Sequence, residues 1–438
     1  MIKLLLFLSL LVFTGINAQN NTLSYASPAE VRLDSAYIHS KVDSIITNGI
    51  KNKAFPSAQV LVAKDAKIIF HKAYGFHTYD SIQPAALDDI YDLASVTKIM
   101  GPLPGLMKLV EEGKLDLDKP FSTYWKPWKK RKDKRNITLR EILAHQAGLE
   151  PYIVFLNDVL KKNGNIKKRF VKTSAKNKFH HKAYEGLYVK DRFNRKMFRK
   201  INRSKVSEDK KYTYSGLTFL IFPKLIEQLT GEDYRSYLQT NFYTPIDAKT
   251  LTFLPKSKTF SHKIVPTEMD TIFRHGLTRG FVHDENAALL GGISGNAGLF
   301  GTATDLAKMM QLYLNYGSYN GEQLIAEYVV KEFIQVQYPD NDNRRGLGFD
   351  KPYLNNAELS LSEAYPSPKV SASSFGHSGF TGTFVWADPE TKLVYIFLSN
   401  RVYPTRKQRA IYDLNIRSVI QDVFSPLAPK GETINLAD

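Results

Sequence analysis

The chain has 438 residues, of which 43% are hydrophobic and 12% aromatic, and its formal net charge is +17. This composition indicates a globular protein with one large two-part domain or two domains, because the chain is too long for one small core. The absence of cysteine excludes a disulfide framework, a thiolate zinc site and a cysteine nucleophile.

The N-terminus has the pattern of an export signal. Lys3 precedes an apolar run over residues 4–13, and Ala18 is a small residue suited to cleavage. The run is too short to span a bilayer comfortably. We therefore predict a signal peptide at residues 1–18 and a periplasmic or secreted protein. The alternative is anchoring by an uncleaved N-terminal segment.

Residues 31–74 predict a helix followed by two strands. Apolar residues between Val31 and Ile45 recur on one helical face, which indicates an amphipathic helix. The runs 58–64 and 67–74 have the composition of strands and flank an Asp65-Ala66 turn, so they predict a hairpin.

A Ser-x-x-Lys sequence at Ser95 and Lys98 opens the next helical pattern. Helical spacing places the two side chains on one face, one turn apart. A serine hydroxyl is a weak nucleophile until a neighbouring base takes its proton, and a desolvated amine can be that base. The helix dipole also favours negative charge at this end. The motif alone is weak, because such a pair is more often a helix cap beside a solvated lysine. Pro102 and Pro104 predict a kink or break farther on.

Two later stretches carry candidate acid or base groups. Residues 137–149 predict a short helix with a capping box of Thr138 and Glu141. His145, near its end, is a candidate base, although a structural histidine is the more frequent role. The sequence Tyr212-Thr213-Tyr214-Ser215-Gly216 then opens a second, apolar helix.

Residues 161–211 form a strongly basic insert, with 19 lysines and arginines against four acidic residues. Such a run is usually a solvated or poorly ordered segment. The alternative is contact with anionic polymers of the cell envelope. We do not expect nucleic acid as a partner, because the chain has an export signal and no nucleic-acid motif.

Past the insert, the chain contains a glycine-rich stretch and then returns to strands. The stretch Gly291–Gly301 lacks the ending of a phosphate-binding loop, so we expect it to form tight turns that line a cleft. Thr304-Asp305 is predicted to cap a helix. Strands at 375–387 and 393–399, and a last helix at about 405–424, complete the chain. No metal pattern or cofactor motif is visible in the sequence.

Strands at both ends of the chain, with helices between them, predict an α+β fold. One sheet would be built from both termini, and a helical region would be inserted between its strands.

Three short motifs follow one another along the chain: Ser95-x-x-Lys98, Tyr214-Ser215-Gly216 and His377-Ser378-Gly379. The series resembles the serine beta-lactamase and penicillin-binding-protein family, whose class A members carry Ser-x-x-Lys, Ser-Asp-Asn and Lys-Thr-Gly. The likeness is greatest to the class C beta-lactamase-related branch and spans most of residues 55–425.

The resemblance implies an antiparallel sheet flanked by helices from both termini, with an inserted all-helical lobe and an active site between the two. We expect a single catalytic domain at 19–438. Its sheet lobe would cover about 30–92 and 345–425, and its helical lobe about 93–344.

The resemblance also implies a role for each motif residue. Ser95 would be the acylated nucleophile, and Lys98 would help to take its proton. Tyr214 would exchange protons with Ser95 and the leaving group, and His377 would face them from the edge strand. The backbone N–H groups of Ser95 and Phe380 would form the oxyanion hole.

Ser378, Gly379 and Gly216 would contact the substrate. If the second motif is instead aligned on Tyr212-Thr213-Tyr214, Tyr212 would be the acid or base. Ser215 and the following helix favour Tyr214. Because an imidazole changes charge near neutrality, we also expect activity to follow the protonation of His377.

Two departures from the family pattern bear on the substrate. Gly216 stands where the family has Asn or Asp, and His377 replaces the lysine of true class C beta-lactamases. We therefore predict a cofactor-free, exported serine hydrolase that cleaves an amide or ester, with a peptidoglycan fragment or a related small molecule as its substrate. The alternatives are a true class C-type beta-lactamase, a small-ester carboxylesterase, or a catalytically silent envelope-binding protein.

Overall fold

The computed structural model describes residues 22–258 and 263–424. The predicted signal peptide, residues 1–18, lies outside these ranges. No helix within them combines the length and the apolar character that crossing a bilayer requires.

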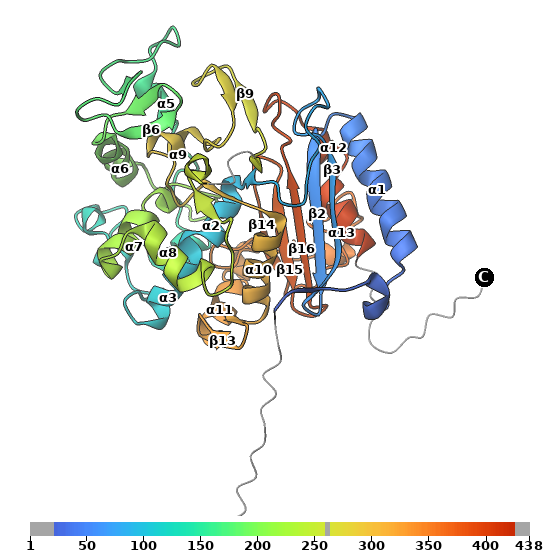
Figure 1. The fold of residues 1–438 in the computed structure, drawn as a ribbon. Coiled ribbons are helices and arrows are strands. Elements are labelled where there is room, and N and C mark those ends of the chain that lie inside the picture. Colours follow the sequence, from blue (N-terminus) through green and yellow to red (C-terminus); the bar gives the residue numbers. More distant parts are fainter. Residues whose placement is uncertain (1–21, 259–262, 425–438) are drawn as a thin grey trace, which may run out of the picture.

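A six-stranded sheet is built from both ends of the chain (Figure 1). Its order is β1-β3-β2-β16-β15-β14, and only the pairing of β1 with β3 is parallel. The strands are β1 Ser24–Tyr25, β2 Ser57–Lys64, β3 Lys67–Gly75, β14 Phe375–Ser378, β15 Phe384–Asp388 and β16 Leu393–Ser399. Because β2 pairs along its length with β16, the N-terminal hairpin and the C-terminal strands form one sheet. The predicted fold class is confirmed.

Helices cover both faces of this sheet. On one face, α1 (Ser35–Lys51) packs against α13 (Ile416–Val423), which follows the short α12 (Ala410–Asp413). On the other face, α10 (Ala303–Leu314) packs against β2, β15 and β16. The side chains of β2 alternate between the two cores, as the pleat requires: Val60 and Val62 face α1 and α13, while Leu61 and Ala63 face the core that contains α10.

Local sequence signals set several element boundaries. The predicted hairpin turn is present, with Asp65 and Ala66 at φ of 51° and 61°, and the capping box of Thr138 and Glu141 is also present. The predicted cap at Thr304-Asp305 is wrong. Thr302 caps α10, because its extended backbone leaves the side chain free to accept the N–H of Asp305.

The inserted lobe contains most of the helices: α2 Thr97–Met100, α3 Pro102–Glu111, α4 Leu139–Leu143, α5 Leu156–Val159, α6 Phe193–Arg203, α7 Phe222–Thr230, α8 Tyr234–Leu238, α9 Glu285–Leu289 and α11 Glu327–Ile334. It is more mixed than the all-helical lobe that we predicted. It also holds β4 Tyr91–Asp92, β8 Thr252–Phe253, β9 Glu268–Asp270, β10 Gly276–Thr278, β11 Leu299–Gly301, β12 Ser318–Tyr319 and β13 Glu322–Gln323. Strands of two or three residues are too short to give an alternating pattern in a sequence.

The basic insert, residues 161–211, is folded. Three short strands, β5 Val171–Lys172, β6 His181–Tyr184 and β7 Leu187–Val189, form a small sheet, and α6 follows. Phe193, Met197 and Ile201 are buried at four-residue steps along α6. The insert is therefore not poorly ordered, although its charged side chains are largely solvated as expected.

Candidate active site

Ser95 and Lys98 are in direct contact. Ser95 lies in a single 3-10 turn that leads straight into α2. Lys98 Nζ donates to Ser95 Oγ at 2.9 Å and to the carbonyl oxygen of Asn296 at 3.2 Å. The lysine is 2% exposed, and its Nζ lies 5.3 Å from the centre of the Tyr214 ring. A buried amine is thus held beside the hydroxyl by a backbone carbonyl and an aromatic ring.

The backbone is held by hydrogen bonds just ahead of Ser95, and the helix that follows it is short. Ahead of it, the buried Asp92 carboxylate accepts the N–H of Ala94 at 2.9 Å and that of His283 at 2.6 Å. Behind it, the helical segment is interrupted at Gly101, and α3 begins at Pro102. The predicted break is therefore confirmed, and only about one helical turn carries the pair of catalytic candidates.

The turn between β14 and β15 rests on the segment that leads to Ser95. Thr381 Oγ1 donates to the carbonyl oxygen of Asp92 at 2.7 Å, and Thr383 Oγ1 donates to that of Leu93 at 3.0 Å. A Cβ added to Gly379 would lie 2.6 Å from the Leu93 carbonyl oxygen, so only glycine permits this approach. The first and third motifs are thereby locked together.

Tyr214 lies between two histidine rings. Its ring centre is 4.5 Å from that of His145 and 6.2 Å from that of His377. His145 Nδ1 accepts the N–H of Ser215 at 3.2 Å, so the ring hydrogen of neutral His145 is on Nε2. Burial, followed by the positive charges of Arg345 and Lys98, holds the pKa of His145 well below its usual value. His145 is therefore a neutral support for Tyr214.

Burial keeps the His377 ring neutral at physiological pH. The ring is 3% exposed, and burial, followed by the positive charges of Arg345 and Lys98, lowers its pKa to about 3. Nδ1 donates to the carbonyl oxygen of Ser378 at 2.7 Å, so Nε2 carries a lone pair. This buried atom has no hydrogen-bond partner among the described residues. The premise that this imidazole changes charge near neutrality therefore does not hold, because the ring is deeply buried. The dependence of activity on pH stays a prediction.

Arg345 is a site residue that the sequence did not indicate. Its guanidinium carbon lies 5.0 Å from the centre of the Tyr214 ring, and its Nε donates to Tyr212 Oη at 3.2 Å. It forms an ion pair with Asp350 at 3.5 Å. Burial opposes ionisation of Asp350, but Arg345 and Arg344 outweigh it and hold the pKa of this carboxyl below its usual value. Tyr212 thus bonds to Arg345, while Tyr214 lies next to Lys98.

Ser95 lies where two cavities meet. The smaller, about 300 Å³, is lined by Ser95, Tyr214, Arg345, Asp350, His377, Ser378, Gly379, Phe380, Tyr412 and Arg417. The larger, about 540 Å³, is lined by Ala94, Ser95, Tyr152, Val154, Leu156, Asn157, Leu160, Ile272, His283, Asp284, Glu285, Asn296, Ala297, Phe380 and Arg406. Ser95 and Phe380 are the residues that the two cavities share. The structure thus gathers the predicted residues of the first and third motifs and Tyr214, whereas Gly216 lines neither cavity.

The backbone N–H groups of Ser95 and Phe380 make no hydrogen bond to other described residues. Both residues border the space into which a substrate carbonyl would enter. Phe380 is itself held in place, because Arg401 Nε donates to its carbonyl oxygen at 2.7 Å and the guanidinium lies 4.5 Å from its ring centre. Two free donors on held backbone can stabilise an oxyanion.

Comparison with known proteins agrees with this geometry. A family model described as Beta-lactamase matches residues 42–417. The chain belongs to the beta-lactamase family. Within this family it is a serine hydrolase of the beta-lactamase and penicillin-binding-protein type.

Two curated relatives of this beta-lactamase-family chain carry the name "Putative D-alanyl-D-alanine carboxypeptidase". The protein from Salmonella enteritidis PT4 is 30% identical, and the one from Salmonella typhimurium LT2 is 31% identical. Each alignment is 403 positions long and covers 86% of this chain and 86% of the relative.

Solved structures show the same fold at low identity. EstCE1, a hydrolase with promiscuous acyltransferase activity, matches with a TM-score of 0.62 and 17% identity, covering 88% of this chain and 98% of that one. A class C beta-lactamase from Rhodobacter sphaeroides matches with a TM-score of 0.59 and 15% identity, covering 88% and 99%.

Asn296 and Arg345 are the site residues of this family member that sequence reasoning missed. Asn296 lies within the glycine-rich stretch, whose predicted cleft-lining turns are present, with Gly291, Gly292 and Gly298 at positive φ. That stretch was therefore an available signal for the carbonyl that binds Lys98. No sequence signal pointed to Arg345, because it lies outside the three motifs and far from His377 along the chain.

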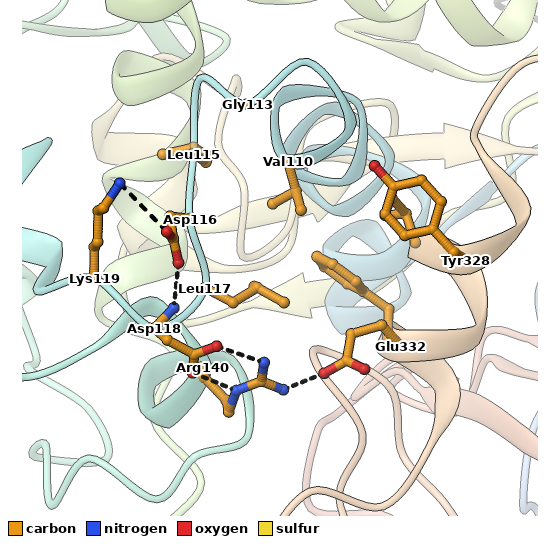
Figure 2. A pocket seen from close by; sticks show the side chains of 12 residues that line it. Val110, Gly113, Leu115, Asp116, Leu117, Asp118, Lys119, Arg140, Tyr328 and Glu332 are labelled. Carbon is orange, nitrogen blue, oxygen red and sulfur yellow. Dashed lines mark hydrogen bonds and ion pairs between the residues drawn. The ribbon is translucent and has the colours of Figure 1, made fainter.

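A third cavity, about 350 Å³, shares no lining residue with the other two. Figure 2 shows its polar side chains paired with one another: Arg140 lies between Asp118 and Glu332, and Lys119 pairs with Asp116. It contains no predicted site residue, so we do not regard it as catalytic.

Proposed function

We propose that this serine hydrolase is exported and cleaves an amide or ester bond in a peptidoglycan fragment or a related small molecule, through an acyl-enzyme. The observation that carries the proposal is the contact between Lys98 Nζ and Ser95 Oγ at the meeting point of two cavities. One half of a substrate would occupy each cavity, with its reactive carbonyl at Ser95.

In the proposed reaction, Ser95 Oγ attacks the carbonyl carbon while its hydroxyl proton passes to Lys98 Nζ, which lies 2.9 Å away. The N–H groups of Ser95 and Phe380 stabilise the oxyanion, which in such sites contributes a few kcal/mol. A proton delivered through Tyr214 lets the amine or alcohol leave. Water then attacks the ester on Ser95 by the reverse route and frees the acid.

The choice of substrate rests on two supports. The Salmonella relatives are named for D-alanyl-D-alanine carboxypeptidase activity, which is amide cleavage in a cell-wall peptide. His377, which stands in place of the family lysine, is neutral. A neutral ring cannot attract the carboxylate of a beta-lactam as a lysine would, so the third motif gives no support to a true beta-lactamase, and the peptidase alternative rests on the relatives.

The test is a substrate panel with a label for the nucleophile. Purified protein would be given nitrocefin, a short nitrophenyl ester and defined muropeptides, and fluorescent penicillin would be located by mass spectrometry. We expect label on Ser95 and turnover of a muropeptide or an ester above that of nitrocefin. No label on Ser95 and no turnover in the panel would instead support a catalytically silent envelope-binding protein.

The basic insert supports a second proposal, that the protein binds anionic polymers of the envelope through α6. Arg192, Arg195, Arg199 and Arg203 recur at three- and four-residue steps, so they lie on one face of the helix, and all four are exposed. Within the described residues, no carboxylate forms an ion pair with any of them. Like charges at this spacing cost a helix stability. An external polyanion would relieve that repulsion.

A further inference from the structure

The larger cavity beside Ser95 has two walls that are fixed by their own hydrogen bonds. Asp270 holds the loop after β9 by accepting the N–H of Ile272 at 2.7 Å. Across the cavity, Asn286 accepts the N–H of Phe155 at 3.3 Å and donates to the carbonyl oxygen of Ile153 at 3.0 Å. The side chains that these backbones present are therefore held in place before any ligand arrives.

The walls are mostly apolar. Val154, Leu156 and Leu160 come from one side, and Ile272 and Phe380 come from other segments. Val154, Ile272 and Phe380 are each about half exposed, at 49%, 48% and 47%. Large apolar side chains gathered at one opening mark a ligand site, since covering them removes apolar surface from water.

Among the described residues that line this cavity, the arginine is paired with carboxylates on both sides. Arg406 is bound on one side by Glu268, with N–O distances of 2.6 and 2.9 Å, and on the other by Glu285 at 2.8 Å. His283 Nε2 pairs with Glu268 as well, at 2.9 Å. Within the part of the chain that the structure describes, Asp284 forms no ion pair: its Oδ1 accepts from Ala287 N–H and from the side chain of Asn296. The cavity therefore carries an excess of negative charge in a chain whose net charge is +17.

We propose that the larger cavity is the acyl subsite and that it favours an uncharged, apolar group in the part of the acyl chain that enters it over a carboxylate at the same place. This rests on the proposed function, in which Tyr214 protonates the leaving group. Tyr214 lines the smaller cavity, so the leaving group occupies that side and the acyl half occupies the other. Ile272 contacts the acyl chain. The negative charge of Asp284 repels a carboxylate carried by the acyl group.

The test compares p-nitrophenyl esters that share one leaving group. We expect kcat/KM to rise at least about tenfold from acetate to hexanoate, because each buried methylene is worth up to about fourfold. The adipate monoester, which matches hexanoate in length but ends in a carboxylate, should be hydrolysed at least about tenfold less well than hexanoate. Alkylboronic acids, which bond reversibly to an active serine, give the same comparison without turnover; hexylboronic acid should bind more tightly than methylboronic acid.

Two variants with matched controls locate the effect. Ile272→Ala should flatten the chain-length gradient, whereas Ile82→Ala, at an exposed isoleucine that lines neither cavity, should keep it. Asp284→Asn should narrow the gap between adipate and hexanoate, since asparagine can keep the helix cap but has no charge. Asp233→Asn, at the cap of α8, should leave the gap unchanged.

The outcomes separate the two proposals. Ester hydrolysis that survives Ser95→Ala would count against the proposed function itself. Hydrolysis that depends on Ser95 but shows no gradient with chain length, together with equal binding of the boronic acids, would overturn the acyl subsite alone. So would adipate hydrolysis as fast as that of hexanoate.

Discussion

Gly379 and Leu93 approach each other so closely that no other residue fits at position 379. A Cβ on Gly379 would lie 2.6 Å from the Leu93 carbonyl oxygen and 2.0 Å from Thr383 Oγ1. Through this contact the strand that carries His377 rests on the backbone just ahead of Ser95. The distance between the nucleophile and the Phe380 N–H is therefore set by the absence of a side chain.

Replacing this glycine should cost both stability and activity. For Gly379→Ala we expect a loss of about 1–3 kcal/mol in the free energy of unfolding, because the methyl group overpacks a buried contact. We expect a loss of at least about 100-fold in kcat/KM, because Phe380 would shift relative to Ser95. Urea unfolding and ester hydrolysis measure the two effects.

The matched control is Gly216→Ala. Apart from its two chain neighbours, no described residue has an atom within 4 Å of a Cβ built at Gly216, and its φ is not positive. Its stability should stay within about 0.5 kcal/mol of the parent. If Gly379→Ala behaved like this control, the close packing of the two motifs would not matter for function.

Removing either member of the Ser95 and Lys98 pair should abolish hydrolysis. Ser95→Ala and Lys98→Ala are each expected to lose at least about a thousandfold in kcat, and the double variant should be little worse, because the two groups act as one unit. Steady-state kinetics with the best substrate, alongside circular dichroism to confirm folding, checks this. A Ser95→Ala protein that turns over substrate at the parental rate would end the assignment.

The two neighbouring tyrosines should differ in their effects. Tyr214→Phe is expected to lower kcat by about 100-fold or more, the range for a lost general acid or base. Tyr212→Phe should keep most activity, since Tyr212 bonds to Arg345 and does not line the smaller cavity. Equal losses of kcat in the two variants would favour the alternative alignment of the second motif, in which Tyr212 carries the proton.

His377 should make the protein sensitive to acid through its stability. The unfolded chain takes up a proton near pH 6.5, whereas the pKa of the native ring is about 3. Between these values the unfolded state binds more protons, so this contribution rises with pH and is lost as pH falls. From pH 7 to pH 5 it should cost about 2 kcal/mol.

Urea titrations at the two pH values test this. His377→Asn should lose less stability on acidification than the parent, whereas His275→Asn, at an exposed ring, should match the parent. The activity of the parent should show no transition near pH 6.5 that disappears in His377→Asn. If such a transition is found, the ring is charged near neutrality and the burial argument is wrong.

The arginine face of α6 should give salt-dependent binding. Arg195→Gln with Arg199→Gln should weaken binding to an anionic envelope glycan at least about tenfold at low salt, and the parent should itself lose affinity as salt screens charge over about 8 Å. Surface plasmon resonance at several salt concentrations would measure this. Lys224→Gln with Lys249→Gln removes the same charge elsewhere and serves as the control. Unchanged affinity in the arginine variant would leave the insert with a structural role only.

Much of the site could be predicted from neighbours along the chain. Ser95 and Lys98 are three residues apart, and one helical turn brings them together whatever surrounds them. The β2–β3 hairpin and the cap of α4 are also short-range, since the groups that bond are within a few residues of each other. The ordered motifs then pointed to the family and so to the sheet built from both termini.

Other features depend on segments that meet only when the chain has folded. The sequence showed that position 377 is a histidine, but its charge depends on burial and on Arg345 and Lys98 from two other segments. Likewise, the sequence of α6 was interpreted from its charges alone, because the apolar face of this helix is recognised only when a core is seen to cover it. Residue spacing determines short-range geometry. Solvent access and electrostatic interactions through space depend on residues far apart in the chain, so only the tertiary structure decides them.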